Sequence, residues 1–454
     1  MHVSLAVGAT LVASIYGVSA QDCRAGAAKN ILGNWYCDAV DSISYTNFGS
    51  SGTYNMITDM TGGNCQSEPK EYSGPLAPLN DEVSWHFRGP VKLEKFAYYV
   101  PGTGLPDKRD AKPTLHERRH GHSHLHHNKE VRDIKRKAAM DQKRGVGDLV
   151  TTIINGQEVS WINTWDGTQD VAEDAPAAPE PAPAPVAPAV EDDNTPTQKQ
   201  NSGSTDGGAP PVNAGWGNWG RQAFYDAEAG IADGLTFLNH HGGEGSGVFD
   251  YELGNSLSYA SADGLSGSAS PQCLNNELIG DNNEIIIMSD KKCNNGDCGA
   301  VRPGTVAHHG FGGDSKLFLI EFSMPITGKT GWNEDMPALW MLNAQIPRTL
   351  QYGKAECSCW ESGCGEWDIF EVLDSGNTRC KSTLHGNISG GDSNYFNRPA
   401  DKTIKAAVVY DGLSSTGHIK ILDDATEFGE TLSGIEVTGF TLESVLSSIF
   451  SLGS

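Results

Sequence analysis

The sequence predicts an all-β protein, and three observations support this fold class. The 454 residues include 54 glycines, a content that suits short strands joined by tight turns. Short apolar runs recur along the chain with Gly, Asn and Asp between them, at the spacing of a β-sandwich or barrel. Between Cys23 and Gly102, no apolar repeat of helical period reaches a useful length.

The expected strands fall into two groups. In the first part of the chain they are Ile43–Phe48, Thr53–Ile57, Val83–Phe87 and Val91–Val100, followed by a hairpin of Leu149–Ile154 and Val159–Trp165. In the second part they are Leu235–Leu238, Val248–Leu253, Glu284–Met288, Leu317–Phe322, Ala338–Leu342, Trp367–Leu373, Thr403–Tyr410 and His418–Leu422. The continuous apolar runs Ile285–Met288 and Ala406–Val409 are typical of strands buried on both faces.

Changes of composition divide the chain into parts. Residues 21–105, together with 145–168, are expected to form a small glycine-rich β domain, and residues 215–440 a larger β-sandwich domain. Residues 106–144 are basic and rich in histidine, and residues 169–214 begin with alternating Pro and Ala. Neither segment can bury enough apolar surface to fold, so both are predicted to be disordered linkers.

The two ends of the chain indicate secretion. Residues 1–20 have an apolar centre and end in Val18-Ser-Ala20, a small-x-small cleavage pattern, so they read as a secretory signal peptide. No later segment approaches the roughly 18 apolar residues of a membrane-spanning helix. Residues 441–454 are expected to be a C-terminal tail that lacks the uninterrupted apolar stretch of a GPI signal. We therefore expect an extracellular protein without a membrane span.

The basic insertion offers two interpretations. Six of the 14 histidines lie between His116 and His127, and imidazoles bind zinc, copper and nickel. Nothing nearby would preorganise such ligands, so we favour a solvated linker and expect no metal and no cofactor. The insertion also contains dibasic pairs that resemble processing-protease sites: Lys108-Arg109, Arg118-Arg119, Lys135-Arg136 and Lys143-Arg144.

Charge and cysteine content narrow the class of protein. A formal net charge of -24 argues against nucleic acid as a partner, because phosphates need a basic surface. The negative charge is compatible with a neutral polymer as partner.

An even count of ten cysteines in a secreted chain predicts disulfides. Three cysteines lie early and seven late, so either a bridge links the two halves or each half keeps a free thiol.

Three acids crowd one apolar segment, Glu366-Trp-Asp-Ile-Phe-Glu371. Strand alternation puts Glu366 and Asp368 on one face and would turn Glu371 to the other. A β-bulge at Ile369 or Phe370 would return Glu371 to the carboxylate face, and bulges are common beside active sites. The alternative is a solvated acidic edge strand, which the neighbouring apolar and aromatic residues disfavour.

Paired carboxylates of this kind suit glycosidase chemistry. Two carboxyl groups about 5 to 5.5 Å apart serve a retaining glycosidase, one as nucleophile and the other as proton donor. A third acid between them would raise the pKa of its neighbours by like-charge repulsion.

The motif Glu366-x-Asp368-x-x-Glu371 resembles the catalytic strand of family 16 glycoside hydrolases, the laminarinase-like enzymes, in its bulged form. Leu317–Pro325 and Met336–Leu342 are similar to the two strands before that motif, and Thr383–Gly386 is similar to the segment after it. As a whole, the chain resembles the fungal target-of-SBF cell-wall proteins, which are described as probable circularly permuted 1,3-β-glucanases. The motifs specific enough to transfer roles lie between residues 317 and 386.

This resemblance implies a concanavalin-like jelly roll whose concave face holds several sugar units. It makes Glu366 the nucleophile, Glu371 the general acid and base, and Asp368 the assisting residue between them. The implied activity is an endo-1,3-β-glucanase of the cell wall, with wall β-1,3-glucan as partner. A transglycosylase that remodels the same glucan and a non-catalytic glucan-binding wall protein remain as alternatives.

Further residues are candidates for substrate binding. Trp340 is either a sugar-stacking platform or plain core, and Trp360 and Trp332 are weaker candidates for stacking. His385 is expected on the neighbouring strand, as a donor to a substrate hydroxyl or as a core histidine. Glu321 matches an acidic position of the preceding family strand and is expected to orient groups at the cleft wall.

Four cysteines surround the motif: Cys357, Cys359, Cys364 and Cys380. Their spacing lacks the paired C-x2-C pattern of zinc sites, so disulfides are the favoured interpretation. Such bridges would hold the loop before the catalytic strand. Asn387-Ile-Ser389 is a candidate sequon for one N-glycan.

Overall fold

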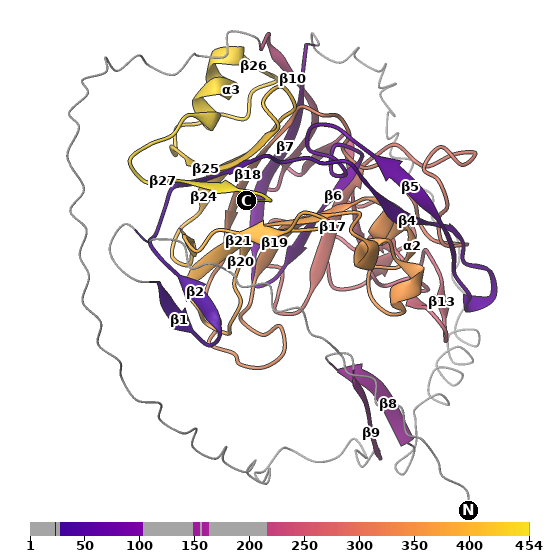
Figure 1. Ribbon diagram of the computed structural model, residues 1–454. Coiled ribbons are helices and arrows are strands. Elements are labelled where there is room, and N and C mark those ends of the chain that lie inside the picture. The colour runs from indigo at the N-terminus through magenta and orange to yellow at the C-terminus, as the bar shows by residue number, and fades with distance from the viewer. Residues whose placement is uncertain (1–22, 24–27, 103–148, 155–156, 163–215, 454) are drawn as a thin grey trace, which may run out of the picture. The chain divides into compact units, whose positions relative to one another are not determined.

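The computed structural model describes Cys23 and residues 28–102, 149–154, 157–162 and 216–453 (Figure 1). The predicted signal peptide, the basic His-rich insertion with its dibasic pairs and the Pro/Ala-rich linker lie outside the described residues. None of the helices that the structure describes has the length and apolar character needed to cross a membrane.

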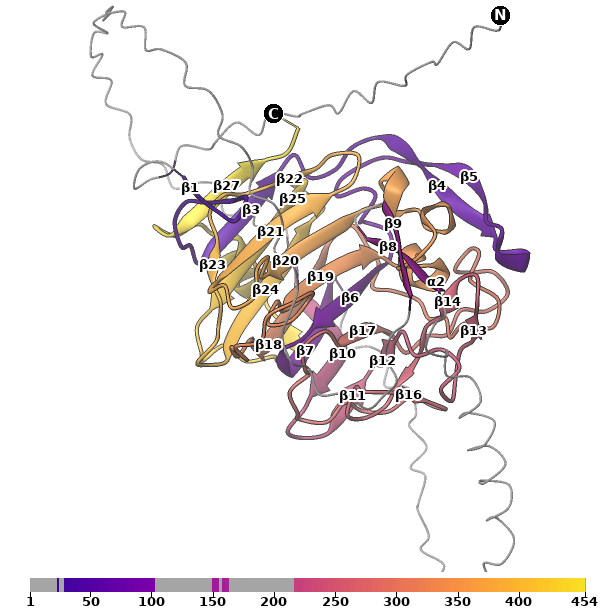
Figure 2. The same cartoon turned by 90° about the horizontal axis from the view of Figure 1, so that it is seen from below.

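Most described strands belong to two large sheets, in which neighbouring strands are antiparallel except at one edge. The sheet that carries the three acids, here called the site sheet, has the spatial order β16 (Gly267–Ser268), β15 (Ser258–Ala260), β12 (Leu235–Asn239), β17 (Glu284–Ser289), β6 (Val83–Arg88), β19 (Ala338–Asn343), β20 (Glu366–Glu371), β21 (Arg379–His385) and β22 (Gly390–Gly391), with β23 (Phe396–Asn397) paired to β21. Figure 2 shows these strands side by side.

The second sheet, here called the back sheet, has the order β11 (Ile231–Asp233), β10 (Trp219–Asp226), β7 (Lys92–Pro101), β18 (Lys316–Ser323), β24 (Ile404–Asp411), β25 (Thr416–Leu422), β3 (Ser42–Thr46) and β27 (Ser447–Ser451), with β26 (Thr431–Leu432) paired to β10. The remaining strands form hairpins: β1 (Lys29–Ile31) with β2 (Asn34–Tyr36), β4 (Gly52–Asp59) with β5 (Gln66–Tyr72), β8 (Leu149–Ile154) with β9 (Gln157–Ile162), and β13 (Phe249–Asp250) with β14 (Gly254–Asn255). The helices are short: η1 (Thr61–Gly63), α2 (Gln345–Thr349), η2 (Ala355–Cys357), η3 (Trp360–Ser362) and α3 (Gly434–Thr441).

A single apolar core contains the inward side chains of both sheets. Trp367 of the site sheet packs edge-on against Tyr45 and Tyr410 of the back sheet, with ring centroids 5.4 Å apart in both pairs. Aromatic rings prefer this edge-to-face arrangement to a direct face-to-face stack. This core makes the two sheets a β-sandwich, which confirms the predicted all-β fold class.

Two strands are buried on both faces, as their continuous apolar runs predict. On β17, Ile285 and Ile287 belong to the core between the sheets, whereas Ile286 and Met288 pack in a second cluster on the other face. On β24 the same alternation holds, and its outward residues pack beneath α3. Ser433 begins α3 with a capping box, in which its hydroxyl accepts from the backbone N–H of Glu436.

Three strands between residues 42 and 101 belong to the sandwich, and one of them, β3, lies near the edge of the back sheet. Strand β6 lies between β17 and β19 in the site sheet, and β7 lies between β10 and β18 in the back sheet. The separate glycine-rich domain expected for residues 21–105 therefore differs from the observed arrangement. The physical reason is that alternation predicts a strand but does not identify its partner.

Two further predictions concern the hairpin after the basic insertion and the C-terminal residues. The hairpin predicted after the basic insertion is present as β8 and β9, paired from Leu149 with Ile162 to Ile154 with Gln157. The tail expected for residues 441–454 instead contains β27, which pairs in parallel with β3. The C-terminal segment thus supplies the edge strand of the back sheet.

Candidate active site

A β-bulge shapes the strand that carries the three acids. Along β19, Leu339 lies opposite Phe370, and the next residue, Trp340, lies opposite Asp368. Ile369 is therefore the extra residue on β20, and the pairing of β20 with β21 shifts over the same stretch. The bulge predicted at Ile369 or Phe370 is confirmed.

The bulge brings all three carboxylates to one cleft. Glu366, Asp368 and Glu371 line a cavity of about 300 Å³ on the outer face of the site sheet. The other side of β20 buries Trp367 and Phe370 in the core between the sheets. Besides the acids, the cavity is lined by Arg88, Ala338, Trp340, Leu342, Ile346, Gln351, Tyr352 and Trp360.

Glu366 is held by a loop that a disulfide closes. The indole Nε1–H of Trp360 donates to Oε2 of Glu366 over 2.5 Å. Trp360 opens η3, and the Cys359–Cys364 disulfide joins the two ends of the loop around it. Gly363 ends η3 with a φ of 86°, a left-handed conformation that favours glycine. The short cross-linked loop thus fixes the indole over the carboxylate.

Asp368 and Glu371 each face a basic side chain. Nε2 of His385 on β21 lies 3.0 Å from Oδ2 of Asp368. The guanidinium of Arg88 lies 3.7 Å from Oε1 of Glu371, an ion-pair distance rather than a hydrogen bond. Nε of Arg88 donates to the carbonyl of Met336 over 2.9 Å, which orients the guanidinium.

Burial is the largest cause that raises the pKa of each of the three carboxyl groups. The charge of Asp368 raises the pKa of Glu366 and Glu371 further, and both reach about 8. Arg88 opposes these effects at Asp368 and Glu371, and the hydrogen bond from Trp360 opposes them at Glu366. Near neutral pH the three acids therefore share protons, because three full charges would repel one another in a poorly solvated cleft.

Three of the predicted substrate-binding residues lie at the carboxylates. Trp340 and Trp360 line the cavity, Trp340 in its floor with 5% of its surface exposed and Trp360 at its edge with 43% exposed. His385 contacts the site through Asp368. The structure thus brings Trp340, Trp360 and His385 to the acid strand.

Two other predicted residues lie elsewhere. Glu321 is on β18 of the back sheet, where it accepts from Lys95 over 3.1 Å, so it does not line the cleft. Alternation along β18 turns Ile320 to the core and Glu321 to the opposite face, away from the site sheet. Trp332 is 79% exposed in the segment before β19 and is not among the residues that line the cavity.

The disulfides decide whether a bridge links the two halves of the chain, and they correct the prediction for Cys380. Cys65 forms a disulfide with Cys357, so a bridge does link the two halves of the chain. Within the described part of the chain, the further disulfides are Cys23–Cys37, Cys293–Cys298 and Cys359–Cys364. Cys380, expected in a disulfide, is instead a buried free thiol whose Sγ lies 3.8 Å from Sδ of Met324. Its strand turns it into the core, away from the cysteine-rich loop.

The predicted sequon lies on the loop after β21. The side-chain amide of Asn387 donates to the carbonyl of Thr53 over 3.2 Å and to the hydroxyl of Tyr72 over 2.7 Å. These contacts join the loop to the β4–β5 hairpin. Glycosylation at Asn387 stays a prediction.

Three residues of the cleft, Arg88, Gln351 and Tyr352, were not predicted from the sequence. Arg88 comes from β6, more than two hundred residues before the acid motif, in a segment expected to form another domain. Gln351 and Tyr352 come after α2 in a stretch with no recognisable pattern. Only the strand pairing of β6 with β19 brings Arg88 to the carboxylates.

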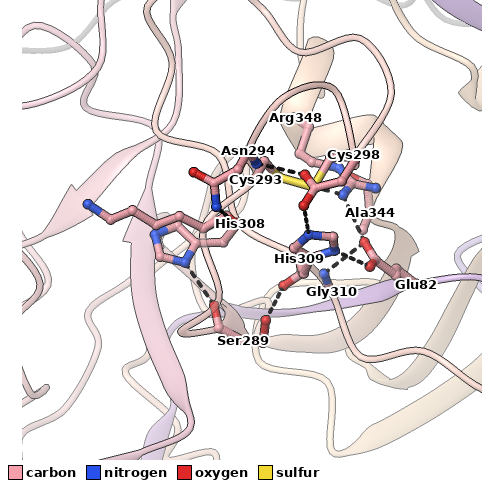
Figure 3. Close-up of a disulfide and its surroundings, with 12 residues drawn as sticks. Glu82, Ser289, Cys293, Asn294, Cys298, His308, His309, Gly310, Ala344 and Arg348 are labelled. Carbon is pink, nitrogen blue, oxygen red and sulfur yellow. Dashed lines mark hydrogen bonds and ion pairs between the residues drawn. A yellow bond between two sulfur atoms is a disulfide. The ribbon is translucent and has the colours of Figure 1, made fainter.

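A second cluster of charged and sulfur-containing side chains lies around a disulfide (Figure 3). Ligand-type atoms of Cys293, Asp297, Cys298 and His309 lie within 4.8 Å of one another. The two sulfurs are bonded to each other and so lack the thiolate charge that binds metals. His309 bridges Glu82 at 2.5 Å and Asp297 at 3.1 Å, so the cluster acts as a cross-link between loops.

Comparison with known proteins identifies two matching family models. One is described as cell wall protein YJL171C/Tos1, C-terminal, and covers residues 217–440. The other is described as cell wall protein YJL171C/Tos1, N-terminal, and covers residues 41–101. Both descriptions are of cell wall proteins, which confirms the predicted location. No solved structure matches the chain significantly.

Several fungal relatives are similar over almost their whole length. A protein of Arthroderma benhamiae named probable circularly permuted 1,3-β-glucanase is 44% identical over 100% of both chains. Proteins named probable circularly permuted 1,3-β-glucanase TOS1 are 39% identical in Saccharomyces cerevisiae, covering 88% of this chain and 90% of the relative, and 38% identical in Candida albicans, covering 90% and 92%. The chain belongs to the YJL171C/Tos1 family of cell wall proteins.

Proposed function

We propose that this protein is a retaining endo-glycosidase that cleaves the β-1,3-glucan of the cell wall. The observation that carries the proposal is the bulge at Ile369, which gathers Glu366, Asp368 and Glu371 in one cleft beside Trp340. Carboxylates gathered beside an aromatic ring suit a sugar substrate, because the ring packs against the apolar face of a pyranose.

In the first step, the carboxylate of Glu366 attacks the anomeric carbon while the protonated Glu371 gives its proton to the leaving glycosidic oxygen. A covalent glycosyl ester of Glu366 and a shortened glucan result. The raised pKa of Glu371, about 8, keeps this acid protonated near neutral pH. Burial and the charge of Asp368 raise the pKa of Glu366 to about 8 as well, and the hydrogen bond from Trp360 opposes this rise and so favours the ionised form that attacks.

In the second step, the carboxylate of Glu371 takes a proton from water, and the oxygen attacks the anomeric carbon. The ester bond breaks, the sugar leaves with its original configuration, and both glutamates return to their starting states. Asp368, with His385 at 3.0 Å, lies between the two and couples their protonation. A sugar hydroxyl in place of water would give transglycosylation by the same route.

The choice of glucan rests on the relatives, whose names specify 1,3-β-glucanases and whose family is of cell wall proteins. The test is release of reducing sugars from laminarin by the purified protein, its Glu366→Gln variant and a Glu361→Gln control. Glu361 is an exposed acid on the same loop, so its variant loses a similar charge outside the cleft. Activity in the wild type and the control, with a loss of at least about a thousandfold in Glu366→Gln, is the expected result.

Two other outcomes would assign a different function. Equal and negligible release by wild type and Glu366→Gln, with retained binding to glucan, would make the protein a glucan-binding wall protein. Longer oligosaccharides formed in preference to reducing sugars would make it a transglycosylase.

A further inference from the structure

A second cavity adjoins the catalytic cleft. It has a volume of about 240 Å³, and it shares Gln351 and Tyr352 with the cleft that holds the three acids. Its other walls include His240, Leu253, Asn255 and Leu257, with Leu350 and neighbouring residues from the end of α2. The side chains of this dipeptide therefore form a wall common to both cavities.

The carboxylate of Glu284 holds both side chains of this dipeptide. Glu284 on β17 accepts from the amide of Gln351 over 2.9 Å and from the hydroxyl of Tyr352 over 2.7 Å. His240, which lines the second cavity, lies 2.8 Å from the amide oxygen of Gln351 through Nε2. A chain of hydrogen bonds therefore runs from the second cavity to Glu284.

The same carboxylate supports the floor of the catalytic cleft. Nδ1 of His86 donates to Glu284 over 2.7 Å, and the ring of His86 stacks on Trp340 with centroids 5.1 Å apart. Burial acts to raise the pKa of Glu284, but the hydrogen bond from His86 and the other polar contacts outweigh it, so that the pKa falls to about 2 and the group is charged. Glu284 is therefore a charged anchor between the two cavities.

The helix before the dipeptide is held by the cluster of Figure 3. Arg348 of α2 donates to Glu82 over 2.8 Å, and Glu82 also bonds His309. The backbone carbonyl of Arg348 accepts from the backbone N–H of Arg302 over 3.0 Å. These contacts fix the helix before the wall, and the hydrogen bonds to Glu284 hold Gln351 and Tyr352 within the wall itself.

The second cavity has the composition of a sugar site. Leucines 253, 257 and 350 give it apolar surface, while His240, Asn255 and Gln351 give it hydrogen-bonding groups. A cavity of about 150 Å³ accommodates a benzene ring, so the larger volume here suits a six-membered sugar ring. Its place beside the catalytic cleft suits another unit of the same polymer.

We propose that the second cavity binds a sugar unit of the glucan chain whose bond is cleaved between Glu366 and Glu371, and that Glu284 is the positioning residue for the wall between the two sites. This inference rests on the proposed function, because it takes the same glucan as ligand. It makes long oligosaccharides better ligands than short ones, since only long ones reach both cavities.

The experiment compares the dissociation constants of laminaritriose and laminarihexaose, by calorimetry, in the inactive Glu366→Gln protein. We expect the hexaose to bind at least about tenfold more tightly than the triose. His240→Ala, which removes a wall of the second cavity, and Glu284→Gln, which removes the charged anchor, are each expected to reduce this ratio to about threefold or less. Tyr251→Ala is the control, because Tyr251 is 83% exposed and does not line the cavity.

The affinity ratio distinguishes positioning from folding, since partial unfolding would weaken both ligands together. A ratio that stays at about tenfold in His240→Ala and Glu284→Gln would overturn the inference and leave the proposed function intact. A protein that binds neither oligosaccharide, and whose wild type releases no sugar from laminarin, would overturn both.

Discussion

The indole N–H of Trp360 donates to Oε2 of Glu366 over 2.5 Å. Burial and the charge of Asp368 raise the pKa of Glu366, and this hydrogen bond lowers it. Trp360→Phe keeps an aromatic ring but removes the donor. Because a hydrogen bond to a charged group contributes about 1.5 to 3 kcal/mol, the acidic limb of the kcat/KM profile should move up by about one to two pH units.

The direction of this shift depends on the role of Glu366. A nucleophile acts when ionised, so activity rises as pH rises through its pKa, and a higher pKa moves that rise to higher pH. Trp332→Phe, an exposed tryptophan outside the cleft, should leave the limb where it is. An acidic limb that is identical in Trp360→Phe and wild type would contradict this role for the indole.

Asp368→Asn should move both limbs of the profile to lower pH, and the alkaline limb reports on Glu371. After burial, the charge of Asp368 is the largest cause of the raised pKa of Glu371. Without that charge the pKa of Glu371 falls from about 8, so this acid loses its proton at lower pH and the alkaline limb of kcat/KM shifts downward. The pH profile with a laminari-oligosaccharide measures the shift. An alkaline limb that stays in place or moves upward would argue against the coupling.

Glu371→Gln should lower the activity and raise the stability relative to wild type. The folded pKa of Glu371, about 8, lies above the unfolded value of about 4.3, so the folded state binds more protons in between. Its contribution to stability is present below about pH 4 and is lost as pH rises towards 8. The amide variant does not undergo this loss.

The Tm of Glu371→Gln relative to wild type should therefore increase between about pH 4 and pH 8, measured by calorimetry, while kcat falls at least about a thousandfold. Glu361→Gln, the exposed control, should show no such trend. A Tm difference that is constant across this pH range would show that Glu371 titrates normally.

Two of the disulfides should differ in their effects: loss of one should mainly lower stability, and loss of the other should mainly lower activity. Cys65–Cys357 joins residues 292 apart, whereas Cys359–Cys364 joins residues 5 apart. Replacing both members of the first pair by serine should lower the free energy of unfolding by about 2 to 5 kcal/mol, because the longer loop gains more entropy when unfolded.

Replacing Cys359 and Cys364 by serine should lower the stability less but reduce kcat/KM, because the loop that holds Trp360 over Glu366 is released. Denaturant unfolding and laminarin hydrolysis measure the two effects. A larger loss of stability from the short-range pair than from the long-range pair would contradict this assignment.

Local sequence predicted the acid strand well. Three acids among apolar residues can share a face only if one extra residue is inserted, and the structure has that residue at Ile369. The apolar runs of β17 and β24 likewise predicted burial on both faces, because every second residue of a strand points the same way.

Long-range pairing could not be predicted in this way. Glu321 has a strand environment like that of the acids, but alternation does not tell which sheet a strand joins, and β18 joins the back sheet. The same limit hid Arg88, which reaches the cleft only because β6 pairs with β19. Nearness in sequence places Cys380 with the cysteine-rich loop, whereas its strand buries it in the core.

Glu366 is the residue that we propose forms the covalent intermediate of a retaining reaction. This role is tested most directly by incubating the protein with 2-deoxy-2-fluoro-β-laminaribiosyl fluoride, followed by mass spectrometry of the intact chain and of its peptides. We predict one added disaccharide, located on Glu366. An adduct on another residue, or inversion at the anomeric carbon of laminarin products, would contradict this role.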